Sequence, residues 1–239
     1  MGATPGGYIA PMGSIADNVS AVRERVAEAL ERCGRGGERV TIVAVTKTFG
    51  AEVVDAVIRA GVSDIGENRV QEFLAKREQV TLPCRWHLVG PLQRNKATKA
   101  IGAFHTIQSL DGVRIAQTLD RLGTERGVTT RALLEVNTSA ESSKHGVGAD
   151  EATDVAAEIA ALSSISLEGL MTVGPLSMDA DQTRRCFRTL FTLRESIRGA
   201  TGLAMPELSM GMSGDFEIAL EEGATILRLG RVITGERST

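Results

Sequence analysis

Lys47 is the residue of this sequence whose type and position most directly suggest chemistry. It follows the apolar run VTIVAV near the end of a predicted strand, and strand alternation directs Val43, Val45 and Lys47 to the same side. An amine that projects from an apolar wall loses hydration, which lowers the pKa of a lysine and favours the neutral form that attacks aldehydes. The alternative is a lysine whose head group extends into solvent as the strand ends.

A second group of residues suits a phosphate. The segment GMSG (211–214) precedes a predicted helix, and LGR (229–231) ends the last predicted strand. Small residues, the Ser213 hydroxyl and backbone N–H groups at a helix start favour a phosphate dianion, although turn glycines around an N-cap serine are the simpler interpretation. Together with Lys47, these segments predict a ligand that carries an aldehyde and a phosphate. Pyridoxal 5′-phosphate (PLP) is the first candidate, and a sugar phosphate on a Schiff-base aldolase is the second.

Arg228 distinguishes further between these ligands. Arg228 lies on the same side of the predicted strand as Ile226 and Gly230, so its side chain can point toward a bound ring. A guanidinium that faces a pyridine nitrogen donates a hydrogen bond and disfavours protonation of that nitrogen. The alternative is an ordinary ion pair at the rim. Asn68, in a turn after a strand, could bind a phenolic oxygen, but such turns commonly hold an Asn without function.

The chain alternates predicted strands and helices after one helix that starts at Ser14. The predicted strands are 40–47, 62–66, 84–90, 104–108, 132–137, 165–170, 206–210 and 224–230. A doubly wound open sheet would also alternate in this way. The number of strands, and the lack of G-x-G-x-x-G after the first, favour an α/β fold with a single (β/α)8 TIM-type barrel and an extra N-terminal helix. Reactive groups in such barrels lie at the carboxyl ends of the strands.

Composition and charge exclude several classes of protein. The chain has 239 residues, is 42% hydrophobic and carries a net charge of −3, which gives no basic footprint for nucleic acid. Its longest basic cluster, Arg94, Lys96 and Lys99, is interpreted as a solvated helix face. The odd number of cysteines indicates reduced thiols, and no metal-ligand spacing is present. We therefore expect a cytoplasmic protein with no membrane span, with residues 1–13 as a flexible tail and 14–239 as one domain.

These motifs resemble those of the pyridoxal phosphate homeostasis proteins, which share the fold of the alanine racemase N-terminal domain. The matching stretches are VAVTK (43–47), GENRVQE (66–72), WHLVGPLQRNK (86–96), HTIQSLD (105–111), EVNTSAESSKHGV (135–147), GLMTVGP (169–175), LSMGMSGD (208–215) and RLGRVITG (228–235). The resemblance implies a PLP aldimine on Lys47, a phosphate site at Ser213 and the backbone of Gly230 and Arg231, Arg228 facing the ring nitrogen, and Asn68 near the ring. Arg69 and Arg231 depart from the residues that are common in the family.

Two function classes stay open. A PLP-dependent racemase needs a second base on the opposite face of the ring, commonly a Tyr from another domain, and the only tyrosine here is Tyr8 in the predicted tail. The resemblance instead implies a PLP-binding protein of intracellular PLP homeostasis, with no catalytic residue, that buffers or delivers the cofactor. Its expected partners are PLP and possible PLP-dependent apo-enzymes, with no nucleic acid or membrane, and the expected state is a monomer or weak dimer. An aldolase would need a further acid or base that the sequence does not distinguish.

Overall fold

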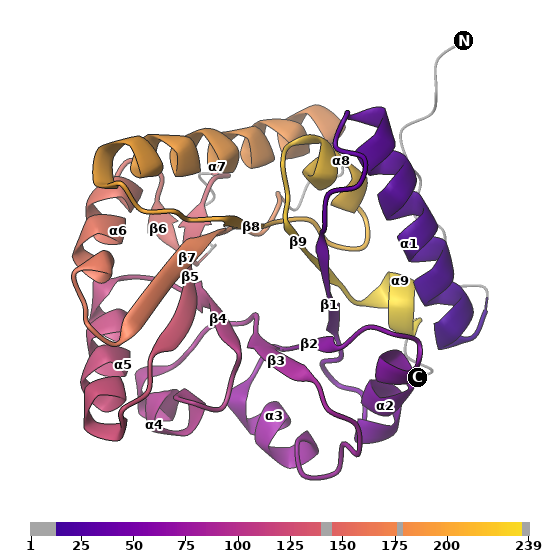
Figure 1. Cartoon of the computed structure of the whole chain (residues 1–239), viewed down its shortest axis with the longest axis horizontal. Coiled ribbons are helices and arrows are strands. Elements are labelled where there is room, and N and C mark those ends of the chain that lie inside the picture. The colour runs from indigo at the N-terminus through magenta and orange to yellow at the C-terminus, as the bar shows by residue number, and fades with distance from the viewer. Residues whose placement is uncertain (1–12, 140–144, 176–178, 236–239) are drawn as a thin grey trace.

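The computed structural model describes residues 13–139, 145–175 and 179–235, and its strands form one closed ring (Figure 1). The sheet order is β4-β3-β2-β1-β9-β8-β7-β5-β6, and a further pairing of β4 with β5 closes it. All these pairings are parallel. The strands are β1 (Thr41–Val45), β2 (Asp64–Glu67), β3 (Arg85–Leu88), β4 (Thr106–Leu110), β5 (Thr130–Asn137), β6 (Val147–Gly148), β7 (Ile165–Met171), β8 (Glu207–Ser209) and β9 (Ile226–Leu229).

The helices surround this ring (Figure 1). They are α1 (Ile15–Arg32), α2 (Ala51–Arg59), α3 (Val70–Lys76), the 3-10 turn η1 (Arg94–Lys96), α4 (Ala97–Ala100), α5 (Val113–Arg126), α6 (Ala152–Ala160), α7 (Ala180–Thr201), α8 (Phe216–Glu221) and α9 (Arg231–Thr234). β6 pairs only with β5. Without it, eight parallel strands make the barrel, so the predicted (β/α)8 fold with an extra N-terminal helix is confirmed.

The strands read as continuous apolar runs because the sheet packs on both faces. Ala44 belongs to a large cluster between the strands and the helices. Its neighbour Val43 belongs to a small cluster with Leu133, Met171 and Ile226, strand residues of the opposite parity that face into the barrel. The apolar part of the barrel interior is therefore small, and polar side chains fill much of the rest.

The extra helix α1 begins as the sequence predicts. Ser14 and Asp17 form a capping box, in which the serine hydroxyl accepts from the Asp17 N–H and the Asp17 carboxylate accepts from the Ser14 N–H. The helix lies against α8 and α9, at the end of the barrel sequence (Figure 1). On this side Arg35 donates to the backbone oxygens of Leu220 and Ala224, at 2.6 and 3.0 Å. α1 thus fastens the segments that follow β8 and β9.

Several predicted boundaries were wrong. The first strand ends at Val45, so Lys47 lies two residues beyond it. The segment of Arg94, Lys96 and Lys99, interpreted as a helix face, is a 3-10 turn followed by four α-helical residues, and the short elements β6 and α9 were not predicted. The predicted tail, residues 1–13, falls outside the described residues except for Gly13. Among the described helices, none is long and apolar enough to cross a membrane.

Candidate functional site

The carboxyl ends of β1, β8 and β9 bring the predicted site residues together. β9 pairs with β1, with Arg228 opposite Val43 and Leu229 opposite Ala44. On its other side β9 pairs with β8, and the Arg228 N–H donates to the Gly211 carbonyl at 3.0 Å. The turn that carries Lys47 therefore lies beside the LGR segment, which lies beside the GMSG segment. This neighbourhood follows from closure of the ring, as the barrel prediction required.

Lys47 is exposed at the mouth of the barrel. The prediction that an apolar strand wall encloses its amine is wrong, because the chain turns away after Val45 and carries the lysine into solvent. Within the described part of the chain, its Nζ has no hydrogen bond or ion pair. The amine is therefore accessible and uncommitted.

The backbone around Lys47 is held tightly although its side chain is free. Thr48 has φ +70, a left-handed conformation that is unusual for a β-branched residue. Thr46 is fully buried; its hydroxyl donates to Glu67 Oε1 at 2.8 Å, and its carbonyl accepts from Lys76 Nζ at 2.7 Å. Lys76 also pairs with Glu67 at 2.6 Å. Backbone strain that surrounding structure maintains is a feature of functional sites.

The Glu67 carboxyl beneath this turn is fully buried. Burial raises its pKa, against the hydrogen bonds from Lys76 and Thr46, which lower it. Its Oε2 atom is buried without a hydrogen-bond partner among the described residues. Because Oε1 is committed to Lys76 and Thr46, Glu67 supports the turn that carries Lys47.

Ser213 joins the two segments that were predicted to bind phosphate. Its hydroxyl oxygen accepts from the Val232 N–H at 3.3 Å, and the serine is 8% exposed. The backbone N–H groups of Ser213 and Gly214 have no acceptor among the described residues. A phosphate accepts hydrogen bonds on every oxygen, so a hydroxyl and unpaired N–H groups at converging turns suit it. The arrangement fits a phosphate monoester.

Hydrogen bonds with other parts of the chain hold the two segments that suit a phosphate. α9 starts at Arg231, an exposed residue, directly after Gly230. Asn18 of α1 donates to the Ile233 carbonyl at 3.0 Å, a buried contact with α9. On the other segment, Asp215 accepts from the Met212 N–H at 2.5 Å just before α8. Contacts within the chain therefore hold both turns in position.

Arg228 is buried in the barrel interior, 5% exposed, so it is not part of an ion pair at the rim, and its orientation toward a ring stays a prediction. Its guanidinium donates to Ser209 Oγ and to the Thr172 carbonyl, both at 2.7 Å. Burial lowers the pKa of Arg228 to about 10, against the opposing effect of the Asp215 and Glu135 carboxyls. The side chain therefore stays charged at neutral pH.

A chain of buried hydrogen bonds continues from Arg228 across the barrel. Ser209 Oγ donates to Gln108 Oε1 at 2.6 Å, and the amide nitrogen of Gln108 lies 3.1 Å from His87 Nδ1. Because Gln108 donates there, Nδ1 accepts, and the neutral Nε2–H tautomer of His87 donates to Asp64 at 2.9 Å. Arg85 closes the chain with two hydrogen bonds to Asp64.

The sequence reasoning missed most of this chain. His87 has a hydrogen-bonded structural role in this chain, and none of Asp64, Gln108 and Ser209 was predicted. The available signal was a polar side chain within each of three short strands, β2, β4 and β8. A buried polar side chain needs a hydrogen-bond partner, so each of these residues indicates that another polar side chain is buried beside it.

Asn68 is half-buried directly after β2, with no hydrogen bond from its side chain among the described residues. Arg69 is exposed and lies 4.0 Å from Glu72. Gly66 makes room beside these residues, because a Cβ there would lie 3.0 Å from Val43 Cγ1 and 3.2 Å from Val45 Cγ2. The mouth next to β1 is thus kept free of side chains at this position. Among the described residues no group of His, Cys, Asp or Glu could hold a metal ion.

Comparison with known proteins gives consistent matches over nearly the whole chain. The family model described as alanine racemase, N-terminal domain, matches residues 18–238. The pyridoxal phosphate homeostasis protein of Aquifex aeolicus is 37% identical over 222 residues, which are 92% of this chain and 97% of the relative. The chain belongs to the pyridoxal phosphate homeostasis protein family.

Solved structures agree with this family assignment. A crystal structure of an unknown protein from Bifidobacterium adolescentis is 39% identical with a TM-score of 0.87, and the match covers 92% of this chain and 94% of that one. PipY of Synechococcus elongatus with PLP bound is 30% identical with a TM-score of 0.82, covering 93% and 100%. The barrel and its extra helix are therefore the family architecture.

The buried chain predicts a pH-dependent contribution of Asp64 to stability. Burial raises the pKa of Asp64, but hydrogen bonds from His87 and Arg85 outweigh it, so the pKa lies well below its usual range. A depressed pKa in the folded state stabilises the protein above the unfolded pKa of about 4 and loses that effect as pH falls. Asp64→Asn should lower the free energy of unfolding by about 2–3 kcal/mol at neutral pH.

Urea unfolding of both proteins between neutral and acidic pH tests this. The difference should be constant above about pH 5 and shrink below about pH 4. Asp154→Asn, an exposed aspartate of α6, is the matched control and should change stability by less than about 0.5 kcal/mol. A difference for Asp64→Asn that does not depend on pH would contradict the account.

Proposed function

We propose that this chain binds PLP and takes part in intracellular PLP homeostasis, holding the cofactor and releasing it to other proteins without catalysing a reaction on it. Names of relatives and the PLP-bound PipY structure support the choice of ligand. The observation that carries the proposal is the pairing of β1 with β9, which puts the accessible amine beside the phosphate-suited turns. The proposed contacts are Lys47, Asn68, Ser213, Arg228, Gly230 and Arg231.

Lys47 would hold the aldehyde carbon as a Schiff base. The support is an exposed amine with no partner among the described residues, on a backbone fixed by Thr46 and Glu67. An amine that reacts reversibly must be reachable and must return to one position, and these two features meet both needs. An exposed Lys47 also suits a protein that releases the cofactor, since water and acceptor groups can reach the Schiff base.

Ser213, with the backbone at Gly230 and Arg231, would hold the phosphate. The convergence of the two turns at the Ser213–Val232 hydrogen bond supports this assignment. Arg231 is exposed and begins α9, so its backbone faces the turn whatever its side chain does. A phosphate here gains charge-assisted hydrogen bonds, each worth roughly 1.5–3 kcal/mol.

Arg228 would face the ring nitrogen, and Asn68 would lie beside the ring. A charged guanidinium donates a hydrogen bond to that nitrogen and disfavours its protonation, which weakens the ring as an electron sink. The rigid attachment of Arg228 to Ser209 and the Thr172 carbonyl supports a fixed position. This electronic setting favours storage of the cofactor over turnover of amino acids.

The racemase alternative needs a second base, and the only tyrosine of the sequence is Tyr8, outside the described residues. The proposed recipients are PLP-dependent apo-enzymes. The protein's cytoplasmic location, its monomeric or weakly dimeric state and a single domain over residues 14–239 stay predictions.

Lys47 should carry the cofactor covalently. Protein incubated with PLP should absorb in the visible range, and borohydride reduction followed by peptide mapping should place the adduct on Lys47. Lys47→Ala should lose the absorbance, whereas Lys96→Ala, on η1, should keep it. An adduct on Lys96 or Lys144, or no uptake of PLP, would sink the proposal.

Turnover of amino acids should be negligible, because no second base faces the ring in this assignment. The PLP-loaded protein should be incubated with L- and D-alanine, and racemisation, transamination and decarboxylation followed by chiral chromatography. Turnover that scales with bound PLP and disappears in Lys47→Ala would restore the enzyme alternative.

The phosphate contacts should contribute more to retention of PLP than the covalent bond does. Several charge-assisted hydrogen bonds of the size given above exceed the net gain from a reversible bond, so Lys47→Ala should still bind PLP in equilibrium dialysis. Pyridoxal, which lacks the phosphate, should bind the wild type at least tenfold more weakly than PLP, a difference of about 1.4 kcal/mol. Equal binding of pyridoxal and PLP would reverse the ranking.

A further inference from the structure

The outer surface where η1 and α4 meet α5 is strongly basic although the chain as a whole is acidic. Two open hollows lie along this seam, of about 400 and 480 Å³. The first is lined by Arg94, Arg114, Gln117, Thr118 and Arg121, and the second includes Arg77, Lys99 and Arg126. No acidic residue lines either hollow, in a chain with 30 acidic and 27 basic residues. We call these two hollows together the basic seam.

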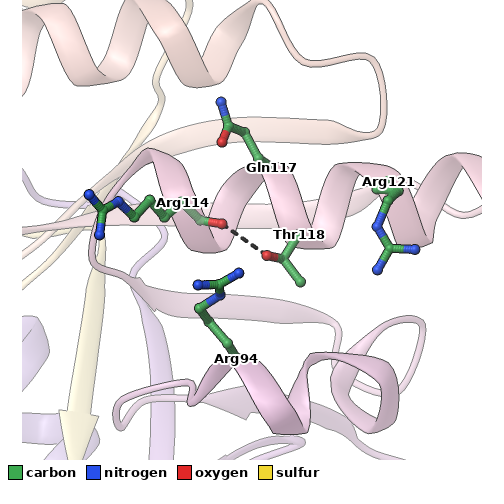
Figure 2. Close-up of a pocket in the computed structure, with 5 residues that line it drawn as sticks. All are labelled: Arg94, Arg114, Gln117, Thr118 and Arg121. Carbon is green, nitrogen blue, oxygen red and sulfur yellow. Dashed lines mark hydrogen bonds between the residues drawn. The ribbon is translucent and has the colours of Figure 1, made fainter.

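The arginines of the first hollow have few partners within the molecule. Arg121 pairs with Glu125 at 2.5 Å, but Arg94 and Arg114 have no carboxylate partner among the described residues, and both are exposed. Arg114, Gln117, Thr118 and Arg121 lie on one face of α5, and Figure 2 shows the Arg94 side chain rising from its short helix between Arg114 and Arg121. Like charges gathered without counter-charges favour an external anion.

α5 lines both hollows. α5 contributes Arg114 and Arg121 to the first and Arg126 to the second. The Arg126 guanidinium donates to the Thr98 carbonyl at 3.0 Å, and both residues line the second hollow, where α5 meets α4. From Arg114 to Arg126 the helix rises roughly 18 Å, a length that several extended residues of a polypeptide would span.

The first hollow also lies close to the proposed cofactor site. Arg114 lies in the first turn of α5, which follows the carboxyl end of β4, and η1 follows the carboxyl end of β3. Both strand ends open on the same barrel mouth as Lys47. A partner bound along the seam would therefore rest on the rim of that mouth.

We infer that the basic seam is a docking surface for an acidic segment of a partner protein. The hollows are open, and they lie at two places along α5, which suits a polypeptide segment laid over them better than a small anion that must be enclosed. A nucleic-acid strand would need aromatic side chains on which bases stack, and the lining residues include none. Guanidinium forks match the carboxylates of Asp and Glu in geometry as well as charge. The inference goes beyond cofactor binding and does not depend on it.

A short fluorescein-labelled peptide of alternating Glu and Ser tests the surface by fluorescence anisotropy, with a Gln and Ser peptide as the uncharged control. The variant Arg94→Ala/Arg114→Ala/Arg121→Ala should weaken binding of the acidic peptide about tenfold, since each exposed ion pair contributes roughly 0.2–1 kcal/mol. The matched control, Arg32→Ala/Arg39→Ala/Arg185→Ala, removes equal charge from exposed arginines elsewhere and should stay within about twofold of wild type.

Unchanged thermal unfolding and PLP uptake in the seam variant will show that the fold and the cofactor site are intact, which separates this test from that of the proposed function. Equal weakening in both triple variants would overturn the inference, because only overall charge would then matter. Displacement of the peptide by low millimolar inorganic phosphate would assign the first hollow to a small anion instead. Tighter binding of a labelled thymidine oligonucleotide at the same residues would assign the seam to nucleic acid.

Discussion

The buried guanidinium of Arg228 is the constraint on which the barrel interior depends. Removing such a group from water costs several kcal/mol unless hydrogen bonds and opposite charges surround it. Ser209 and the Thr172 carbonyl supply the hydrogen bonds, and Asp215 and Glu135 supply the charge. Because Ser209 must then donate onward, the polar interior extends to Gln108, His87 and Asp64. Apolar packing inside the barrel is correspondingly confined to the small cluster around Val43 and Leu133.

The site combines rigid supports with accessible groups. Under the Lys47 turn lies the buried Glu67–Lys76 pair, and behind the phosphate-suited turns lies α1. The groups that would contact a ligand, by contrast, either reach solvent or point toward the open mouth. This separation means that a substitution in the supports should alter position and stability together, whereas one at the exposed Lys47 should alter chemistry alone.

The barrel could be predicted because strands and helices alternate along the chain and the number of strands suits a closed ring, in which strand order determines which loops are neighbours. Lys47 was misplaced because Thr46 continues the β-branched pattern of the strand, while the chain already turns at Thr48 with a positive φ. The chain from Arg228 to Asp64 escaped prediction because its members lie on β9, β8, β4, β3 and β2. Only the closed ring and its register bring them into contact. For the same reason Arg94 and Arg114, distant in sequence, could not be placed in one hollow.

The packing of α1 on α9 has a consequence for folding. Asn18 and Ile233, which join the two helices, are 215 positions apart, so this contact closes one of the longest loops the chain allows. During synthesis α1 leaves the ribosome early, yet the surface that covers its apolar side is made last. Until β9 completes the ring, the amphipathic helix can pack only on α2, and the side that α8 and α9 cover stays exposed. Assembly of the barrel mouth and full burial of the first helix are then the same late event.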